Sequence, residues 1–326
     1  GDIEQGYQYI KKGLNAGKHI VTANKSVVSK YFEELTSLAH EKNLAFLYEA
    51  SVGGGIPILK PLKEEIALNQ ITEIQGILNG TCNYILTRMI NEGLDYEEIL
   101  KVAQELGYAE ADPTADVEGH DTLRKLRILG TIGMQGKVSE EDILLDGIKN
   151  ITAFDIEQIN NMDATVKLIG EVKAKDNGFT AVVQPTIIKK DSYYANVNMT
   201  FNSISFTGNN VGELKFYGQG AGKLTTANAV LRDVLDVIMD TYRKGSPLGT
   251  KKLENLNSSI KEQYYLRISL LRDDILNALQ KMAYKTLSTT DNIAIVTKEV
   301  FLYDIFDMLQ TLEIHKDEYF LARILN

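Results

Sequence analysis

Apolar residues in the first part of the chain recur at spacings that alternate between helix and strand. The pattern predicts a helix over residues 4–17 that ends at Gly17, a short buried strand over 19–21 and a second helix over 31–40. Strands that alternate with helices are typical of a parallel, doubly wound sheet. We therefore expect α/β structure in this part.

The middle of the chain carries longer strand patterns. Alternation at 179–187 and 198–206 predicts strands with one buried face, and apolar spacing over 95–106 and 122–132 predicts helices. An antiparallel or mixed sheet with helices, an α+β arrangement, fits these elements. Residues 76–86, GILNGTCNYIL, are apolar on both sides of a polar hinge, which indicates a strand, a loop and the start of a helix. The backbone donors at that helix N-terminus suit either a capping side chain or an anionic group.

After residue 243 the pattern changes. Residues 244–262 are polar and rich in helix breakers, which predicts a linker. The remainder, 263–326, predicts in order a strand at 266–270, a helix with Ile275, Leu279 and Met282 on one face, a strand at 292–297, a helix over 302–312 and a strand at 319–325. With one further strand before the second helix, which the pattern does not locate, the order is βαββαβ, that of a ferredoxin-like unit.

Composition narrows the classes of function. The chain has 326 residues, 44% of them hydrophobic, and a net charge of −9. It lacks the excess of Lys and Arg that binding to nucleic acid or to an anionic membrane favours, so we expect a small-molecule enzyme. Cys82 is the single cysteine, which excludes an internal disulfide, and no apolar run approaches the length of a membrane span. These features favour a cytoplasmic protein.

Candidate chemistry concentrates in residues 107–129, GYAEADPTADVEGHDTLRKLRIL. Asp121 and Lys125 are four residues apart on a predicted helix and share one face. A lysine beside carboxylates can donate a proton, and the same spacing is also that of a plain surface ion pair. The other acidic residues of this segment are Glu110, Asp112, Asp116 and Glu118.

A glycine-rich loop occupies residues 48–58, YEASVGGGIPI. Three consecutive glycines allow backbone geometries that turn carbonyl oxygens inward, and Glu49 supplies a carboxylate, a combination that suits a hard cation. A sharp loop without a ligand explains the same residues.

A second glycine cluster lies in residues 217–226, YGQGAGKLTT. It does not match the phosphate-binding pattern GxGxxG, because Lys223 stands where the third glycine is required. The segment predicts a tight turn before a helix capped by Thr225 or Thr226.

Four blocks of the sequence, taken in their order and separation, resemble homoserine dehydrogenase. They are GKHIVTANK at 17–25, YEASVGGGIPI at 48–58, GILNGTCNYILTRM at 76–89 and the acidic segment at 107–129. The resemblance implies reversible reduction of L-aspartate 4-semialdehyde to L-homoserine with NADP or NAD, in the biosynthesis of threonine, methionine and isoleucine. It also implies a homodimer or a dimer of dimers.

The resemblance divides the chain into parts with different tasks. Residues 1–48 and 211–243 correspond to the remainder of a Rossmann nucleotide-binding domain, whose first strands and GxGxxG turn would lie upstream of a truncated chain. Residues 49–210 correspond to an inserted catalytic and dimerisation domain. Residues 263–326 resemble an ACT domain, which many members carry for feedback binding of an amino acid.

The resemblance also assigns roles to single residues. Lys125 is the expected proton donor and Lys25 the second active-site lysine. Glu110 and Asp121 are expected to bind the amino group of the substrate and to orient Lys125, with Asp116 and Asp112 as second choices. The expected cofactor contacts are Thr22, Lys25 and Gly220. The expected ligands of a sodium or potassium ion are Glu49 and the carbonyl groups of Val52, Gly54 and Ile56.

Three nearby residues receive structural interpretations. Cys82 has no histidine and orienting acid near it in sequence, so we expect a small buried residue. Glu118 is expected to be structural, and His120 incidental, because adjacent helical residues do not face each other.

The C-terminal resemblance departs from the ACT pattern in one place. ACT domains usually have a Pro-Gly turn after the first strand, whereas this chain reads Leu271, Arg272, Asp273, Asp274. A dimerising or packing module is therefore the structural alternative for this unit. The alternative for the whole chain is a non-catalytic, dimeric, ACT-type protein that binds an amino acid.

Overall fold

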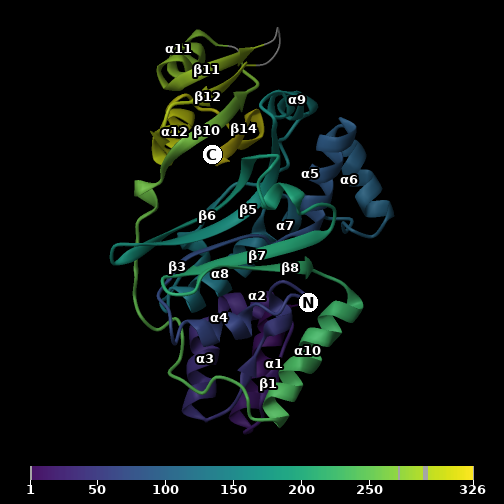
Figure 1. The fold of residues 1–326 in the computed structure, drawn as a ribbon, viewed down its shortest axis with the longest axis vertical. Coiled ribbons are helices and arrows are strands. Elements are labelled where there is room, and N and C mark those ends of the chain that lie inside the picture. The colour runs from purple at the N-terminus through teal and green to yellow at the C-terminus, as the bar shows by residue number, and fades with distance from the viewer. Residues whose placement is uncertain (1, 271, 289–292, 326) are drawn as a thin grey trace.

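The computed structural model describes residues 2–270, 272–288 and 293–325, which form three parts along the long axis of the molecule (Figure 1). A helical N-terminal part lies at one end, a broad sheet lies in the middle, and the C-terminal unit lies at the other end. No helix in the described residues is both long enough and apolar enough to cross a membrane.

The N-terminal part contains the predicted parallel sheet. Strands β1 (Ile20–Val21) and β2 (Phe46–Leu47) pair in parallel, with Ile20 opposite Phe46. Around them the chain forms α1 (Ile3–Asn15), α2 (Lys25–Lys30) and α3 (Phe32–Glu41). The later helix α10 (Lys223–Ile238) returns to this part and contacts β1 (Figure 1).

The start of α10 differs from the prediction. A cap at Thr225 or Thr226 is wrong, because the helix already begins at Lys223 and its N-cap is Gly222. Gly222 has a φ of +134°, which favours glycine, so the chain can enter the helix earlier than a threonine cap would allow. The Thr225 hydroxyl instead donates a hydrogen bond to the Gly222 carbonyl at 2.9 Å.

The middle part is built on four long strands and one edge strand. Strand β3 (Ile71–Ile77) pairs antiparallel with β5 (Ala164–Lys175) and β7 (Phe201–Gly208), and β5 pairs antiparallel with β6 (Gly178–Lys189). These pairings confirm the predicted strands at 179–187 and 198–206. Strand β8 (Gly212–Gln219) pairs antiparallel with β7, so this sheet extends past residue 210.

Helices and short elements connect these strands. The predicted helices are present as α5 (Gly80–Glu92), α6 (Tyr96–Glu105) and α8 (His120–Gly133). The remaining elements are η1 (Glu49–Ser51), α4 (Leu59–Glu65), α7 (Thr114–Val117), η2 (Glu140–Asp142), β4 (Leu144–Leu145), α9 (Ala153–Asn161) and η3 (Tyr194–Asn196). Helix α8 packs on β3 and β5 and also contacts α2 and α4, so it joins the N-terminal part to the sheet.

The C-terminal unit has the predicted βαββαβ order, with one additional two-residue strand before the second helix. Its elements are β10 (Lys261–Ile268), α11 (Asp273–Met282), β11 (Ala283–Ser288), β12 (Ile293–Thr297), β13 (Val300–Phe301), α12 (Leu302–Thr311), η5 (Lys316–Glu318) and β14 (Tyr319–Leu325). Strand β11 is the strand that the pattern did not locate. The strands lie in the order β11-β12-β10-β14, each antiparallel to its neighbour. Leu271 and Asn292, which belong to predicted features of this unit, lie outside the described residues.

The sequence did not predict how the C-terminal unit joins the middle part. Strand β14 pairs in parallel with β6, with Arg323 opposite Thr186, so one continuous sheet runs through both. The predicted linker contributes β9 (Glu254–Asn255), which also pairs with β6, and η4 (Asn257–Ser259).

Two buried ion pairs fasten this junction. The Arg323 guanidinium, 1% exposed, contacts Glu171 of β5 at 2.7 Å, and Arg267 of β10 contacts Asp155 of α9 at 2.9 Å. A buried charge is tolerated only when it is paired and hydrogen-bonded, so each pair depends on both parts being in place.

Candidate active site

The candidate site lies where β1 and β2 end. In parallel sheets of this kind, ligands bind outside the carboxyl ends of the strands. Thr22 follows β1, and its backbone N–H donates to the Leu47 carbonyl at 3.0 Å. Its hydroxyl accepts a hydrogen bond from the Asn24 N–H at 3.1 Å, which places Lys25 in the first turn of α2. The glycine-rich loop leaves the same edge after β2.

Two lysines meet one buried carboxylate at this edge. The Lys125 ammonium lies 2.7 Å from Asp121 Oδ2, and the Lys25 ammonium pairs with Asp121 Oδ1. Asp121 is 4% exposed and Lys125 is 8% exposed, whereas the Lys25 side chain is 38% exposed. The predicted spacing therefore places Asp121 and Lys125 in a buried cluster and not in a surface ion pair.

The charge state of Asp121 follows from these neighbours. Burial alone raises the pKa of its carboxyl group, but the positive charges of Lys125 and Lys25 outweigh burial and hold the pKa well below its usual range. Asp121 is therefore an anion at any working pH, and it keeps two ammonium groups close together.

Residues from another element complete the cluster. The Asn79 amide donates hydrogen bonds to Asp121 Oδ2 at 2.9 Å and to Asp116 Oδ1 at 2.7 Å. The side-chain oxygen of Asn79 accepts a hydrogen bond from the Cys82 N–H, so the predicted capping side chain at the start of this helix is confirmed. The Lys125 ammonium donates to the Leu78 carbonyl at 2.6 Å. Sequence reasoning missed the roles of Asn79 and Leu78, although the polar hinge was the available signal.

Cys82 is buried beneath the cluster, as expected. Its thiol donates to the Asp116 carbonyl at 3.1 Å. Burial, followed by the negative charges of Asp116 and Asp121, raises the pKa of this thiol well above its ordinary value. A thiol that stays protonated is a poor nucleophile.

Other acidic residues of the segment lie outside the cluster. Glu110 is exposed, and its backbone carbonyl accepts a hydrogen bond from the Gln104 side-chain amide at 3.1 Å. Asp112 accepts a hydrogen bond from the Thr114 N–H at 3.1 Å. Glu118 lies 3.5 Å from Lys149 and 3.7 Å from His120. Substrate binding by Glu110 stays a prediction.

The two glycine-rich segments lie against each other. A side chain at Gly54 would place its Cβ 2.4 Å from the Gly220 carbonyl oxygen, so only glycine fits there. The Gly55 N–H donates to the Gln219 carbonyl at 3.1 Å. This close approach brings the expected cofactor contact at Gly220 next to the expected cation loop.

The Glu49 carboxylate makes hydrogen bonds that the sequence did not predict. Its Oε1 accepts hydrogen bonds from the N–H groups of Ile58 and Leu59, and its Oε2 accepts from Lys60, at 2.7 to 2.9 Å. The carboxylate therefore caps the N-terminus of α4 and holds the two ends of the loop together. Cation binding by Glu49 stays a prediction, and the other expected ligands of the ion are backbone oxygens.

The loop carbonyls agree with such a backbone site. Among the residues that the structure describes, the carbonyls of Val52, Gly54 and Ile56 accept no backbone hydrogen bond. Hard cations bind oxygen donors of this kind. The fit supports the predicted cation, which stays a prediction.

Asp233 of α10 is a buried carboxyl group that sequence reasoning missed. Its Oδ2 accepts a hydrogen bond from the Glu49 N–H at 2.9 Å. Burial raises the pKa of Asp233 to about 6, with a further contribution from the negative charge of Glu49. The alternation of apolar residues along α10 gave no sign of this contact.

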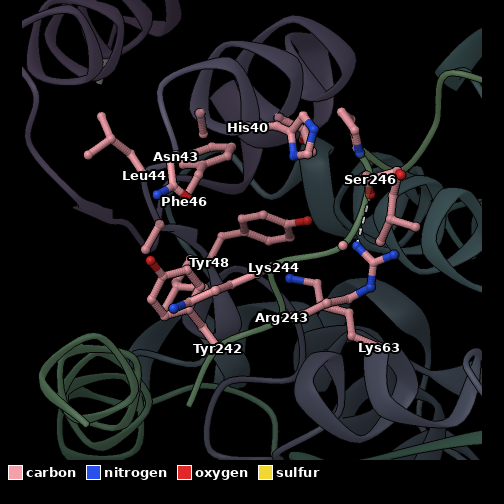
Figure 2. A pocket seen from close by; sticks show the side chains of 17 residues that line it. His40, Asn43, Leu44, Phe46, Tyr48, Lys63, Tyr242, Arg243, Lys244 and Ser246 are labelled. Carbon is pink, nitrogen blue, oxygen red and sulfur yellow. Dashed lines mark hydrogen bonds between the residues drawn. The ribbon is translucent and has the colours of Figure 1, made fainter. Parts of the chain in front are cut away.

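A separate small cavity lies between the end of α3, β2 and residues 242–248 (Figure 2). Its volume is about 90 Å³, and the Arg243 guanidinium donates to the Ser246 carbonyl at its rim at 2.9 Å. The lining contains none of the predicted site residues. Its volume is well below the range typical of ligand pockets, so it does not compete with the lysine cluster as a substrate site.

Comparison with known proteins identifies the family to which these features belong. The family model described as homoserine dehydrogenase matches residues 57–235. A homoserine dehydrogenase from Synechocystis is 43% identical over 242 residues, which are 73% of this chain and 56% of that protein. One from Bacillus subtilis is 42% identical over 281 residues, which are 84% of this chain and 64% of that protein. The chain therefore spans less than two thirds of the length of these relatives.

A solved structure extends the similarity to the C-terminal unit. The crystal structure of a homoserine dehydrogenase from Thiobacillus denitrificans superposes with a TM-score of 0.89 at 31% identity. The superposition covers 100% of this chain and 80% of that one.

Proposed function

This chain belongs to the homoserine dehydrogenase family, and on that premise we propose that the protein catalyses the reversible reduction of L-aspartate 4-semialdehyde to L-homoserine. The observation that carries the proposal is the buried Asp121 carboxylate with an ammonium group on each oxygen. This arrangement holds a proton donor in place within a largely buried site, which carbonyl reduction requires.

Each residue of the cluster has a distinct task in this proposal. When bound, the reduced nicotinamide cofactor would supply the hydride for the aldehyde carbon. Lys125 gives a proton to the aldehyde oxygen, and in the reverse direction it takes the proton from the alcohol. Asp121 and the Leu78 carbonyl fix the Lys125 ammonium, while Lys25 places a second positive charge beside the developing alkoxide. Asp116 and Glu110 bind the substrate ammonium group, for which carboxylates are suitable partners.

The cofactor proposal draws on two further relatives. A hyperthermophilic archaeal homoserine dehydrogenase was solved in complex with NADPH, and it superposes with a TM-score of 0.65 at 27% identity over 74% of this chain and 70% of that one. A protein from Pseudomonas canavaninivorans, named NAD(+)-dependent homoserine dehydrogenase, is 39% identical over 74% of this chain and 69% of its own length. We propose NADP or NAD for this chain, in contact with Thr22, Lys25 and Gly220.

Two further elements belong to the proposal. The loop carbonyls of Val52, Gly54 and Ile56, together with Glu49, hold a sodium or potassium ion that stiffens the loop against Gly220. The protein acts as a homodimer, an expectation that rests on the family resemblance.

The test uses protein made from the complete reading frame. Oxidation of homoserine with NADP or NAD is followed by the absorbance of the reduced cofactor. Lys125→Ala and Asp121→Asn are expected to lower kcat by roughly 10²-fold to 10⁴-fold, the usual contribution of acid-base catalysis. Lys101→Ala, a change at an exposed lysine of α6, is the matched control and is expected to behave like the unsubstituted protein. Absence of turnover with both cofactors, or full activity of Lys125→Ala, would refute the proposal.

A further inference from the structure

An ion pair links the C-terminal unit to a buried carboxylate of the middle part. Lys316 of η5 pairs with Asp146 Oδ1 and also reaches the Leu145 carbonyl at 3.5 Å. Asp146 is 5% exposed, whereas the Lys316 side chain is 58% exposed. Burial raises the pKa of Asp146, and the charge of Lys316 partly counteracts this shift. The buried carboxylate therefore depends on the C-terminal unit for its compensating charge.

The segment around Asp146 packs directly on the acidic segment. The Ile148 N–H donates to the Val117 carbonyl at 2.7 Å. A side chain at Gly147 would place its Cβ 2.2 Å from the Val117 carbonyl oxygen, and one at Gly119 would lie 2.7 Å from Leu145 Cδ1. The two backbones thus touch with no space for adjustment.

That contact lies next to the proposed catalytic cluster. Gly119 has a φ of +88° and is the N-cap of α8, whose second residue is Asp121. A shift of the Asp146 segment would therefore move the start of α8. Because Asp121 bonds to both Lys125 and Lys25, such a shift would change the position of the proton donor.

The ion pair between Lys316 and Asp146 borders an open cleft. A cleft of about 400 Å³ is lined by Glu118 and His120 of the acidic segment, by Asp146, and by Lys316 and Tyr319 of the C-terminal unit. Side chains that border a cleft lack packing on that side, so the position of Asp146 depends more on its ion pair. A second connection reinforces the contact, because the Asn150 amide donates to the Tyr319 carbonyl at 3.2 Å.

We propose that Lys316 and Asp146 are positioning residues for the reaction: the C-terminal unit holds residues 145–148 against the acidic segment and thereby fixes Asp121. This inference rests on the proposed function. It assigns the C-terminal unit an effect on catalysis through the ion pair between Lys316 and Asp146. A change in the position of η5 would therefore change the position of the proton donor, Lys125.

The experiment compares Lys316→Met with Lys298→Met, a change at another exposed lysine of the same unit, in protein of complete length. Lys316→Met is expected to lower kcat roughly tenfold with the cofactor KM within about twofold, because small displacements of catalytic groups are costly. Lys316→Arg keeps the charge and is expected to restore kcat. Asp146→Asn is expected to repeat the loss, and the double variant with Lys316→Met to add nothing to it.

Amide hydrogen exchange gives a readout that does not need turnover. In Lys316→Met, the amides of residues 117–121 are expected to exchange roughly tenfold faster, while those of α12 keep their rates. Equal behaviour of the two methionine variants in both kcat and exchange would overturn the inference, and so would faster exchange throughout the C-terminal unit. If the unsubstituted protein shows no turnover, the proposed function fails. The exchange comparison still decides whether Lys316 holds residues 117–121 in place.

Discussion

Replacing Asp233 with asparagine removes the ionisation of a carboxyl group that the fold holds at a raised pKa. The amide oxygen of asparagine can still accept the hydrogen bond from the Glu49 N–H. The substitution therefore isolates the charge from the contact. Burial is the main cause of the raised pKa. The hydrogen bond from the Glu49 N–H and the charge of Lys63 oppose the rise, while the negative charges of Glu49 and Asp236 add to it.

The magnitude follows from the size of the shift. A rise from 3.8 to about 6, at about 1.4 kcal/mol for each pKa unit, corresponds to about 3 kcal/mol. Between these two pKa values the folded protein binds a proton that the unfolded chain has released. Ionisation of Asp233 therefore reduces stability as pH rises toward 6, and the full cost persists above that pH.

The assay is the thermal midpoint of Asp233→Asn and of the unsubstituted protein across pH. At pH 8 the variant is expected to be more stable by about 3 kcal/mol, or roughly 4 °C, and at pH 4.5 by only about 1 kcal/mol. Asp236→Asn is the matched control, and its effect on stability is expected to have the opposite sign. Burial raises the Asp236 pKa, but Lys60, 2.6 Å away, and Thr241 lower it overall, so loss of this charge is expected to destabilise the protein at pH 8. Parallel pH curves for Asp233→Asn and the unsubstituted protein would refute the reasoning.

Three further predictions concern the loop and the junction. Gly54→Ala is expected to lower the free energy of unfolding, measured by denaturant titration, by at least about 2 kcal/mol, because the new side chain clashes with Gly220. Gly17 also has a positive φ but has open space around it, so Gly17→Ala is expected to cost only about 1 kcal/mol. Equal losses would contradict the clash. Arg267→Met leaves Asp155 buried without its cationic partner and is expected to cost about 3–5 kcal/mol by urea denaturation, with part of the loss recovered on adding Asp155→Asn. A cost below about 1 kcal/mol would show that the pair contributes little. Sodium or potassium chloride is expected to raise the thermal midpoint more than choline chloride at equal ionic strength, and no difference would argue against the cation.

Most elements could be predicted because their evidence is local. The strands β6 and β7 and the helices α6 and α8 follow from periodicity within a dozen residues. The pairing of β14 with β6 could not be predicted this way, because it joins residues more than a hundred positions apart. Arg323 illustrates the difficulty, since its partner Glu171 is 152 residues away in sequence.

The candidate site likewise contains residues that local sequence could predict and residues that it could not. Asp121 and Lys125 could be paired from their spacing on one helix, and the resemblance added Lys25. Asn79 could be recognised as a helix cap, but its bonds to two carboxylates depend on how α5 and α8 pack. Glu49 was harder still, because the helix it caps begins ten residues later in the chain.

The parallel pairing of β14 with β6 gives the C-terminal unit a role in protecting the sheet. Strand β14 covers the backbone donors and acceptors of β6 around Thr186, Ile187 and Ile188. Uncovered strand edges that carry apolar residues readily pair with other chains. The unit therefore helps keep the sheet of the middle part from pairing with strands of other chains, whether or not it binds an effector.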